Sequence, residues 1–402
     1  QLLRLSRREE GGGQRECRIC GRTDRLDGDL CVHCRQFVDL SAFIQRQDVY
    51  LVTTADPGDA NFSLPALEGE AFFTFTDEKT ARTRLKTGVP VLRVYTKNKS
   101  CTGFQYGTRI YVGDYAADNL MDRLADQSEG IRRIAVCRMD VDNLGQAFVA
   151  GFEQGDADPI RRYRYVTLSR TAAFSRQMSL FFQLYVNDLL SGRFEEQTAL
   201  AVSIVYSGGD DVFLVGAWND VITAANRIQS AFTRFTCGAL TISGGIGLFD
   251  EHFPIRAAAA ETARLEDRAK EEPGKNALSL FDPRESHTYS WTVFREKILE
   301  QKEAALQRFF DEEEERGNAF LYQLMALLRQ AQEPGGRINL ARYAYLLARL
   351  EPRRNTPAFE RYRVFAGQMY DWALDPVSRG QLITAIYLYV YRNRRVEHDP
   401  EK

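Results

Sequence analysis

The sequence predicts an α+β protein whose central domain follows the ferredoxin-like order β-α-β-β-α-β. Three observations support this prediction: two C-x-x-C pairs near the start, the stretch YSGGDDVFLVG at 206–216, and alternating strand and helix patterns around that stretch. We divide the chain into four parts. They are a zinc-binding linker (1–38), a β-rich segment (39–127), the ferredoxin-like domain (128–284) and an α-helical C-terminal bundle (285–402).

The composition is that of an ordinary globular protein. Of the 402 residues, 44% are apolar and 27% are charged, and the formal net charge of -2 excludes a strongly basic chain. No apolar run is long enough to predict a membrane span. The chain starts at Gln1 with a segment unlike a signal peptide, which suggests that the N-terminal part of a larger polypeptide is absent.

The first predicted element is a metal site. Four of the seven cysteines form two C-x-x-C pairs separated by ten residues: Cys17, Cys20, Cys31 and Cys34. This spacing is typical of a tetrahedral Zn²⁺ site, and four thiolates leave no position open for catalysis, so we predict a structural role. The alternative is two disulfides in a secreted domain, but the other three cysteines lie unpaired in or near apolar strands. His33 lies inside the second pair and is expected to point away.

Residues 39–127 contain four segments in which apolar and polar residues alternate, separated by Gly, Pro, Asn and Asp. They are 48–54, 70–76, 91–97 and 108–114. We predict a strand for each, and no catalytic pattern stands out among them.

From residue 131 the patterns give the order of the central domain. The predicted elements are a strand (131–140), helical material (143–152 and 164–190), a hairpin (199–206 and 212–217), a helix (219–235), a strand (239–249), a helix (254–270) and a last strand (276–281). In the ferredoxin-like plan the first strand lies beside the hairpin, so its end faces the hairpin tip.

The hairpin tip carries adjacent carboxylates. Ser207, Gly208, Gly209 and Asp210 form the predicted turn, Asp211 opens the second strand, and the glycines let a ligand approach closely. Two carboxylates this close repel each other unless a cation or a proton offsets them. An exposed polar turn would explain the pair alone, but Asp140 at the end of the first strand faces the same tip. Asp140, Asp210 and Asp211 together predict a site for one or two Mg²⁺ or Mn²⁺ ions.

The residues after Asp140 suit a phosphate. The turn Asn143-Leu144-Gly145 opens a helix, whose free N–H groups are typical phosphate donors. Lys270 and Lys275 follow the helix beside the sheet and would supply cations, although solvated lysines are the alternative. Asp142 either binds the metal or caps the helix, and we favour the cap.

These motifs resemble the palm domain shared by polymerases, nucleotidyl cyclases and GGDEF diguanylate cyclases. The chain is most similar to the large subunit of type III-A (Csm) CRISPR effector complexes, in which MDVDNLG, LSRTAAFSRQMSLFF, YSGGDDVFLVG, SGGIGLF and AKEEPGKNALSLF occur in this order. The resemblance covers most of residues 14–402.

The resemblance implies a cytoplasmic enzyme that joins ATP into cyclic oligoadenylate when its complex holds a target RNA. It assigns metal binding to Asp140, Asp210 and Asp211, helped by the backbone carbonyl of Val141. It places the triphosphate along Asn143–Gly145, reaching the two lysines, and makes Ser207 a candidate base contact. The implied partners are the other Csm subunits, the guide RNA and the target RNA, with no membrane.

Two parts of the family are not visible in the sequence: an N-terminal HD nuclease domain and a first palm. Cleavage of single-stranded DNA by this chain is therefore not supported. The helical C-terminal part has eleven arginines against four acids in residues 337–395, which favours either a solvated face or a docking surface for RNA or a neighbouring subunit.

Two other functions stay open. A GGDEF-like diguanylate cyclase fits the fold, although Asp210-Asp211-Val212 replaces its usual acid-acid-Phe run. A catalytically silent palm that serves as a scaffold in the ribonucleoprotein is the other, although buried acids without a function are costly. A template-directed polymerase is disfavoured because no fingers or thumb can be recognised.

Overall fold

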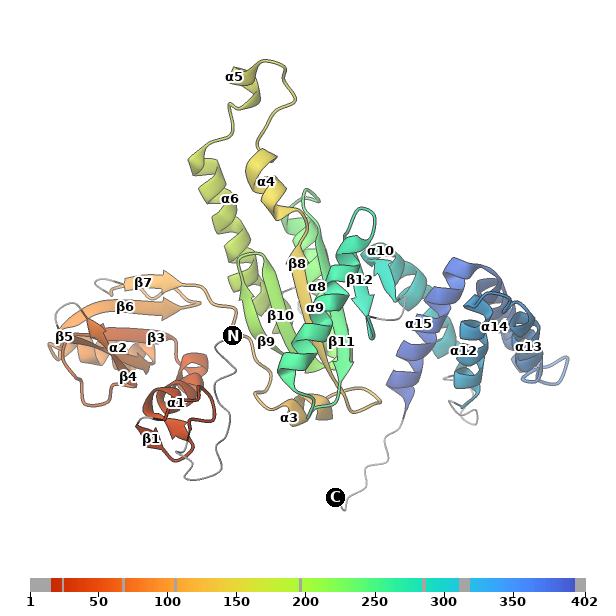
Figure 1. Cartoon of the computed structure of the whole chain (residues 1–402), viewed down its shortest axis with the longest axis horizontal. Coiled ribbons are helices and arrows are strands. Elements are labelled where there is room, and N and C mark those ends of the chain that lie inside the picture. The colour runs from red at the N-terminus through yellow and green to blue at the C-terminus, as the bar shows by residue number, and fades with distance from the viewer. Residues whose placement is uncertain are drawn as a thin grey trace. The chain divides into compact units, whose positions relative to one another are not determined.

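The computed structural model describes residues 16–23, 25–66, 69–104, 107–194, 197–283, 287–310 and 319–394. Residues 1–15, from which we interpreted the start of the chain, lie outside this set. The chain separates into two compact units, Gln1–Val112 and Gly113–Lys402 (Figure 1), and each is described by itself.

The first unit contains a small hairpin and a five-stranded sheet of order β4-β5-β3-β6-β7. Its elements are β1 (Leu26–Asp27), β2 (Leu30–Cys31), α1 (Val32–Arg46), β3 (Val49–Thr53), β4 (Phe62–Ala66), β5 (Gly69–Thr76), α2 (Glu78–Lys86), β6 (Val91–Lys97) and β7 (Gly107–Ile110). All four predicted strands are confirmed. Two elements were not predicted from the sequence. They are β4, which contains a proline that an edge strand tolerates, and α2, in which Ala81 is the one buried residue.

Helix α1 joins the cysteine segment to the sheet. It begins directly after Cys31, whose Sγ accepts a hydrogen bond from the backbone N–H of Cys34, and it runs on to Arg46. The helix therefore crosses residues 38 and 39, where the sequence patterns change from cysteine-rich to alternating. The second pair of cysteines is held at the N-terminus of this helix.

The second unit is built on a six-stranded sheet of order β13-β12-β11-β8-β10-β9. Its strands are β8 (Ile134–Val141), β9 (Val202–Gly208), β10 (Asp211–Ala217), β11 (Ile242–Phe249), β12 (Ala277–Leu280) and β13 (Thr288–Ser290). Strand β8 is paired antiparallel with β10 on one side and with β11 on the other. The order β11-β8-β10-β9 is that of the ferredoxin-like plan, so the predicted α+β fold is confirmed, with β12 and β13 added at one edge.

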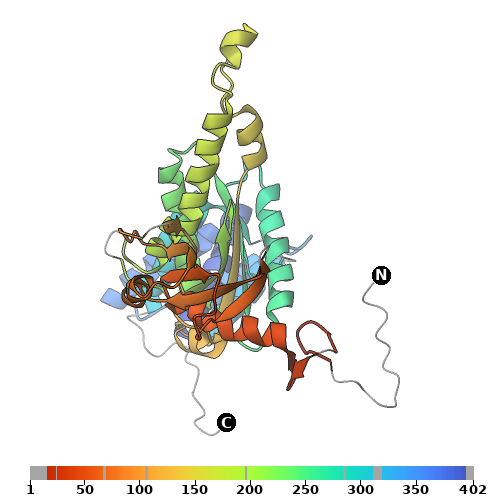
Figure 2. The same ribbon diagram turned by 90° about the vertical axis from the view of Figure 1, so that its left-hand side faces the viewer.

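The described helices of this unit are α3 (Met121–Asp126), α4 (Leu144–Ala150), α5 (Pro159–Arg162), α6 (Leu168–Leu180), the π-helical turn η2 (Phe181–Tyr185), α7 (Val186–Leu190), α8 (Trp218–Phe235), α9 (Ile255–Glu271), α10 (Trp291–Val293), the π-helical segment η3 (Phe294–Glu303), α11 (Ala304–Phe310), α12 (Ala319–Gln332), α13 (Ile338–Ala348), α14 (Pro357–Leu374) and α15 (Pro376–Asn393). The predicted helices of this unit are present in the predicted order, but α3, which lies in the segment predicted to be β-rich, and α5 were not predicted. Helices α4 and α6 extend beyond the end of β8, with α5 at their far tip (Figure 2).

Both faces of the sheet are covered by helices. Cys137, Met139 and Val141 of β8 belong to the large core that includes α8 and the C-terminal helices, whereas Ile134 and Val136 pack with residues of α3 and α9. Successive side chains of a strand point to opposite faces, so Asp140 lies on the α9 face.

Helix α9 approaches the sheet closely because β11 carries glycine where the two meet. A Cβ on Gly245 would lie 2.4 Å from the backbone N of Glu266 and 2.7 Å from the carbonyl O of Thr262. The SGGIG sequence of β11 therefore sets the distance at which α9 lies, and with it the position of the residues that α9 carries toward β8.

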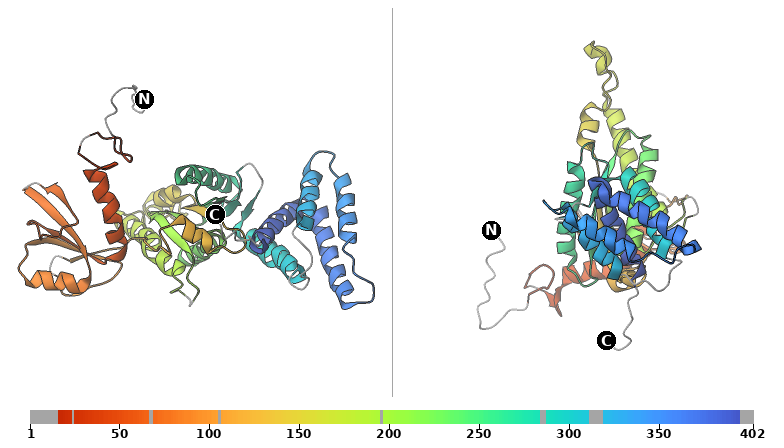
Figure 3. Two further views of the ribbon diagram at one scale, coloured as in Figure 1. Left: turned by 90° about the horizontal axis from the view of Figure 1, so that it is seen from below. Right: turned by 90° about the vertical axis from the view of Figure 1, so that its right-hand side faces the viewer.

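Helices α12 to α15 pack together after the sheet (Figure 3), and their buried residues continue the large core. The predicted helical C-terminal part is confirmed in the described residues from Trp291 onward, whereas Thr288–Ser290 form strand β13 of the sheet. None of the described helices combines the length and the apolar character that a membrane crossing requires.

Candidate active site

The hairpin turn is shorter than the sequence suggested. Strand β9 continues through Ser207 and Gly208, which pair with Val212 and Asp211, so only Gly209 and Asp210 form the loop. Gly209 has a φ of +66°, a conformation that glycine adopts without strain. The prediction that Ser207 and Gly208 lie in the turn is wrong, because both extend the strand pairing.

Ser207 is held by the body of the domain. Its hydroxyl donates to the carbonyl O of Phe182 at 2.6 Å, which ties β9 to the π-helical turn η2. A Cβ on Gly113 would lie 2.6 Å from the Cβ of Ser207, so the space beside this serine is filled by backbone. If Ser207 also contacted a nucleotide base, its hydroxyl would have to bond to the base in addition to the carbonyl O of Phe182.

The end of β8 and the hairpin tip meet as predicted. Asp140 is the register partner of Asp211, and the backbone N–H of Val141 donates to the carbonyl O of Asp210 at 3.2 Å. The three acidic residues therefore lie on neighbouring strands at one end of the sheet, fixed by the pairing of the central strand with the hairpin.

Burial and the mutual repulsion of the three carboxylates raise the pKa of both hairpin acids. Burial, followed by the charge of Asp140, raises the pKa of Asp210 above its usual value. Burial, followed by the charges of Asp210 and Asp140, raises the pKa of Asp211. Neither hairpin carboxylate forms an ion pair in the described structure. A hydrogen bond from Tyr206 and the charge of Arg138 favour the charged form of Asp211, and the charge of Lys270 favours that of Asp210, but both pKa values stay raised, so the negative charge of the tip is only partly offset.

Asp140 has a different environment, because Lys270 of α9 reaches it. The Lys270 ammonium contacts Asp140 Oδ2 and lies 2.7 Å from Glu266 Oε1. Burial opposes the charge of Lys270, but hydrogen bonds to the two carboxylates raise its pKa. Arg138, two residues before Asp140, adds an ion pair to Glu266 at 3.3 Å.

The ion pair between Lys270 and Asp140 affects the position of one of the three proposed metal ligands. Among the described residues, Asp140, Asp210 and Asp211 are not one of the groups whose potential ligand atoms all lie within 4.8 Å of one another. Lys270 holds the Asp140 carboxylate toward α9, whereas the hairpin carboxylates have no cation. Hard carboxylate oxygens and negative charge that is only partly offset fit Mg²⁺ or Mn²⁺, which would neutralise the tip.

The residues expected around a phosphate also lie together. Asn143 adopts a left-handed conformation before α4, and its Oδ1 accepts from the Lys275 ammonium at 2.8 Å. Leu144 and Gly145 form the first turn of α4, and the space around Gly145 is open. Lys275 belongs to a strained turn, in which the φ of Lys275 is +53° and the φ of Asn276 is +50°.

Asp142 does not cap α4, so our preferred interpretation is wrong. Its Oδ2 accepts hydrogen bonds from Thr241 Oγ1 at 2.7 Å, Ser243 Oγ at 3.1 Å and the backbone N–H of Asn276 at 3.0 Å. The residue is only 2% exposed, and its Oδ1 has no hydrogen-bond partner. Asp142 therefore joins the end of β8 to the start of β11 and to the strained turn that carries Lys275.

We expect Asp142→Ala to destabilise this corner by roughly 3 kcal/mol, because three donors lose an acceptor that carries charge. The thermal midpoint should fall, and the Asn276 amide should exchange faster with solvent. Asp267→Ala, at an exposed position of α9, is the matched control and should change neither. Unchanged Asn276 exchange in Asp142→Ala would contradict the anchoring role.

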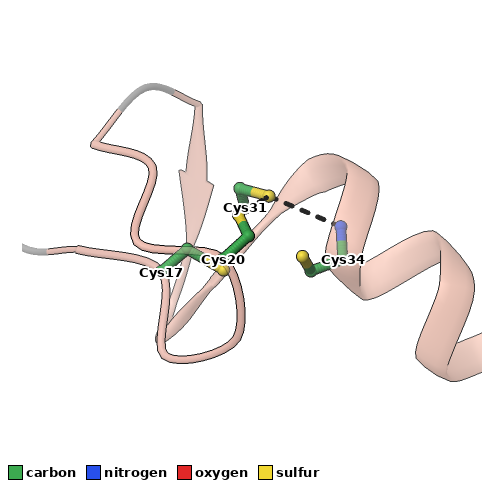
Figure 4. A group of neighbouring side chains, drawn as sticks. All are labelled: Cys17, Cys20, Cys31 and Cys34. Carbon is green, nitrogen blue, oxygen red and sulfur yellow. Dashed lines mark hydrogen bonds between the residues drawn. The ribbon is translucent and has the colours of Figure 1, made fainter. Parts of the chain in front are cut away.

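The four cysteines of the predicted zinc site come together (Figure 4). Their sulfur atoms all lie within 4.8 Å of one another, and Cys20 Sγ and Cys31 Sγ are 3.6 Å apart without a disulfide. Tetrahedral Zn–S bonds of about 2.3 Å separate sulfurs by about 3.8 Å, so the cluster fits Zn²⁺. Hydrogen bonds from the backbone, the N–H of Cys20 first, lower the pKa of Cys17 to about 6, whereas burial and the neighbouring sulfurs raise the pKa of Cys34 to about 12. His33 is exposed and is not one of this group.

Changing Cys31→Ser should remove about one equivalent of zinc and unfold the segment around β1 and β2, because structural zinc contributes folding energy directly. Elemental analysis of protein purified without chelator measures the zinc, and limited proteolysis measures the local order. Cys237→Ser, at an exposed cysteine outside the cluster, should keep both. Wild-type protein without zinc would contradict the assignment.

A second group of potential ligands, not predicted from the sequence, consists of Asp122, Glu251 and His252. Glu251 is paired with Arg132, and the His252 ring lies 3.9 Å from carboxylates of both acids. The imidazole is largely exposed, and Arg132 already neutralises the most buried acid of the group. These contacts describe a surface ion-pair cluster that links α3 to the start of α9.

Comparison with known proteins places this geometry in a family. Residues 133–279 match the family described as Cas10/Cmr2, second palm domain. Residues 307–395 match the second helical domain of the CRISPR RNA silencing complex Cmr2 subunit. The two matches fall on the six-stranded sheet with its helices and on the C-terminal helices.

Whole-chain relatives agree with these matches. The chain is 38% identical over 419 residues to the CRISPR system single-strand-specific deoxyribonuclease Cas10/Csm1 (subtype III-A) of Mycobacterium tuberculosis, which covers 99% of this chain and 49% of that protein. It is 35% identical over 405 residues to the protein of the same name from Streptococcus thermophilus, covering 98% of this chain and 50% of that one. The chain thus spans about half the length of these curated relatives.

Solved structures share the fold. A Csm1-Csm4 cassette in complex with one ATP aligns with a TM-score of 0.64 at 23% identity, covering 93% of this chain and 51% of that one. A Csm1-Csm4 cassette in complex with cA4 aligns with a TM-score of 0.57 at 22% identity, covering 86% and 48%. From the relatives and the palm and helical matches together, the chain belongs to the Cas10/Csm1 family of type III-A CRISPR large subunits.

Proposed function

We propose that this chain supplies one nucleotide-joining palm of a type III-A effector, which makes cyclic oligoadenylate from ATP when the complex holds a target RNA. One observation carries the proposal: Asp210 and Asp211 are carboxylates without an ion pair beside Asp140, at the sheet end that also holds Lys270 and Lys275. Relatives that share the fold include cassettes in complex with ATP and with cA4, which supports adenine nucleotides as substrates.

The chain's own groups would bind and orient the substrate. Asp140, Asp210 and Asp211, with the carbonyl of Val141, would hold divalent cations. When bound, these cations would lower the pKa of a 3′-hydroxyl and neutralise the charge that develops on the leaving pyrophosphate. Lys275 and the first turn of α4 would hold the triphosphate, with Gly145 leaving room for it.

Lys270 would exchange partners as a nucleotide binds. In the described structure it neutralises Asp140, which precedes the proposed triphosphate corner at Asn143 by three residues. Its release from Asp140 would free a ligand oxygen while supplying positive charge to the phosphates. Positioning and charge are what most phosphoryl-transfer catalysis requires of a protein.

The proposed partners follow from the family. A cytoplasmic assembly of Csm subunits with guide RNA would contain the chain, and the cassettes of Csm1 with Csm4 support a contact with a Csm4-like subunit. The arginine-rich C-terminal helices would face RNA or a neighbouring subunit. The deoxyribonuclease activity in the relatives' names is not part of this proposal.

We expect the isolated 402-residue chain to bind ATP with Mg²⁺ or Mn²⁺ but to join nucleotides poorly. One palm holds the donor, and the acceptor 3′-hydroxyl needs a second surface to bring it in line. The test compares the isolated chain with the complete subunit in its guide-RNA complex, at matched concentration, with labelled ATP or GTP and target RNA.

Activity that depends on the complex and on ATP supports the proposal. Robust, concentration-dependent cyclisation by the isolated chain would favour two copies facing each other, as in diguanylate cyclases, particularly with GTP. A complex that binds RNA but turns over no nucleotide would identify the palm as a silent scaffold.

A further inference from the structure

A polar cavity of about 650 Å³ lies along α8, apart from the carboxylates of the candidate active site. It is lined by α8, the end of α7, the start of the C-terminal helices and Asn276, and none of its lining residues is an aspartate or a glutamate. Asp140 points to the α9 face of the sheet, whereas α8 packs on the opposite face. The cavity is therefore a separate site, of a size that suits a small organic ligand.

Three arginines line the cavity, Arg227, Arg234 and Arg295, and the hydrogen bonds of the first and last go to neutral acceptors. Arg295 donates to Gln229 Oε1 at 2.6 Å and to Ser230 Oγ at 2.9 Å. Arg227 donates to the backbone carbonyls of Thr198 at 2.8 Å and Leu189 at 3.3 Å. All of these acceptors are neutral, and neither guanidinium forms an ion pair in the part of the chain that the structure describes. Burial lowers the pKa of Arg227 below its ordinary value, and the charge of Asp220 offsets only part of that effect. An anion in the cavity would neutralise the two guanidinium groups.

The polar groups between the two arginines are fixed in place. Gln229 is only 3% exposed, and its amide donates to Thr233 Oγ1 at 3.1 Å and to Asn276 Oδ1 at 3.3 Å. Asn226 donates to the carbonyl of Ile222 at 3.0 Å, but its Oδ1 is buried without a hydrogen-bond partner. A buried acceptor of this kind calls for a donor, such as an amino or hydroxyl group.

We propose that this cavity binds a small phosphorylated ligand of nucleotide size, whose phosphate contacts Arg227 and Arg295 and whose amino or hydroxyl group donates to Asn226. The inference depends on the charge, volume and unpaired acceptor of the cavity and not on the proposed nucleotide joining. Asn276 connects the two sites, because its side chain faces the cavity while its backbone N–H donates to Asp142.

Calorimetric titration of the full 402-residue chain with ATP and with pyrophosphate tests the proposal. Both titrations are done in EDTA, which removes the divalent cations that the carboxylate site would need. Arg227→Gln and Arg295→Gln should each weaken binding about tenfold, because each removes a charge-assisted hydrogen bond. Arg264→Gln, which removes the same charge from an exposed position on α9, should bind like the wild type.

Further arms distinguish the ligand and protect against misfolding. Arg295→Lys keeps the charge and should lose less affinity than Arg295→Gln, and thermal midpoints show whether each variant is folded. ATP binding without pyrophosphate binding assigns a nucleotide, whereas equal binding assigns the phosphate groups alone. A Lys270→Gln, Lys275→Gln double variant should keep this binding. Complete loss of ligand binding in this double variant, or unchanged affinity in both arginine variants, would overturn the proposal.

Discussion

Replacing both hairpin acids, Asp210→Asn with Asp211→Asn, should lower nucleotide joining by the complete effector about 1000-fold or more. The two carboxylates would hold the divalent cations, and several kcal/mol of transition-state stabilisation depends on those ions. Since Asn keeps the size and leaves β10 paired with β8, target-RNA binding should be unchanged. Labelled ATP turnover by the complex measures the loss.

The same double variant should be slightly more stable than the wild type in EDTA at neutral pH. Folding raises the pKa of both acids, so the charged forms cost stability above those values. As pH falls through the raised pKa values, the wild-type acids take up protons and the difference between the two proteins should shrink.

The controls separate the chemistry from the fold. Asp267→Asn, an exposed acid on α9, should alter neither the turnover nor the pH dependence of the thermal midpoint. Turnover that persists in the double variant would refute the active-site assignment. Turnover that is lost together with a lower midpoint at every pH would point to a folding role.

Gly245→Ala should damage the domain far more than the size of a methyl group suggests. The new Cβ would lie 2.4 Å from the backbone N of Glu266, and backbone cannot rotate away as a flexible side chain can. Helix α9 must then move away from β11, at a cost of at least about 3 kcal/mol. The movement would also separate Lys270 from Asp140 and change the candidate site.

The matched control is Gly367→Ala in α14, where the space around the glycine is open. There the same change should stabilise the helix by roughly 0.5–1 kcal/mol. Thermal midpoints and metal-dependent ATP binding measure both variants. If Gly245→Ala melts and binds ATP like the wild type, α9 is not positioned by the glycines of β11.

The sequence predicted the elements whose patterns are local. The strands and helices around the hairpin follow apolar periodicities. The metal cluster is predicted by spacing alone, from Cys17, Cys20, Cys31 and Cys34. Strand β4 is not predicted, because Pro65 within it is typical of a loop. The Ser-Gly-Gly-Asp run predicts a four-residue turn, although two of its residues extend β9.

The environment of the candidate site depends on contacts between distant residues. Asp142 is held by hydroxyls 99 and 101 residues away in the sequence. Its local sequence shows only that a helix follows, so a helix cap is the simpler prediction. The Lys270–Asp140 ion pair spans 130 residues and depends on how closely α9 approaches the sheet. Arg227 and Arg295 come from separate helices and give no common pattern in the sequence.

Strand β8 is paired on both sides from Ile134 to its last residues, and this limits how the gene can change in length. A one-codon insertion or deletion within the strand would exchange the two faces, placing Asp140 where Met139 is buried and exposing apolar side chains to α9. The chain from Gly151 to Thr167 is mostly exposed and could gain or lose residues without moving the carboxylates. Insertions and deletions should therefore be tolerated in residues 151–167. Strand β8 should tolerate substitutions only.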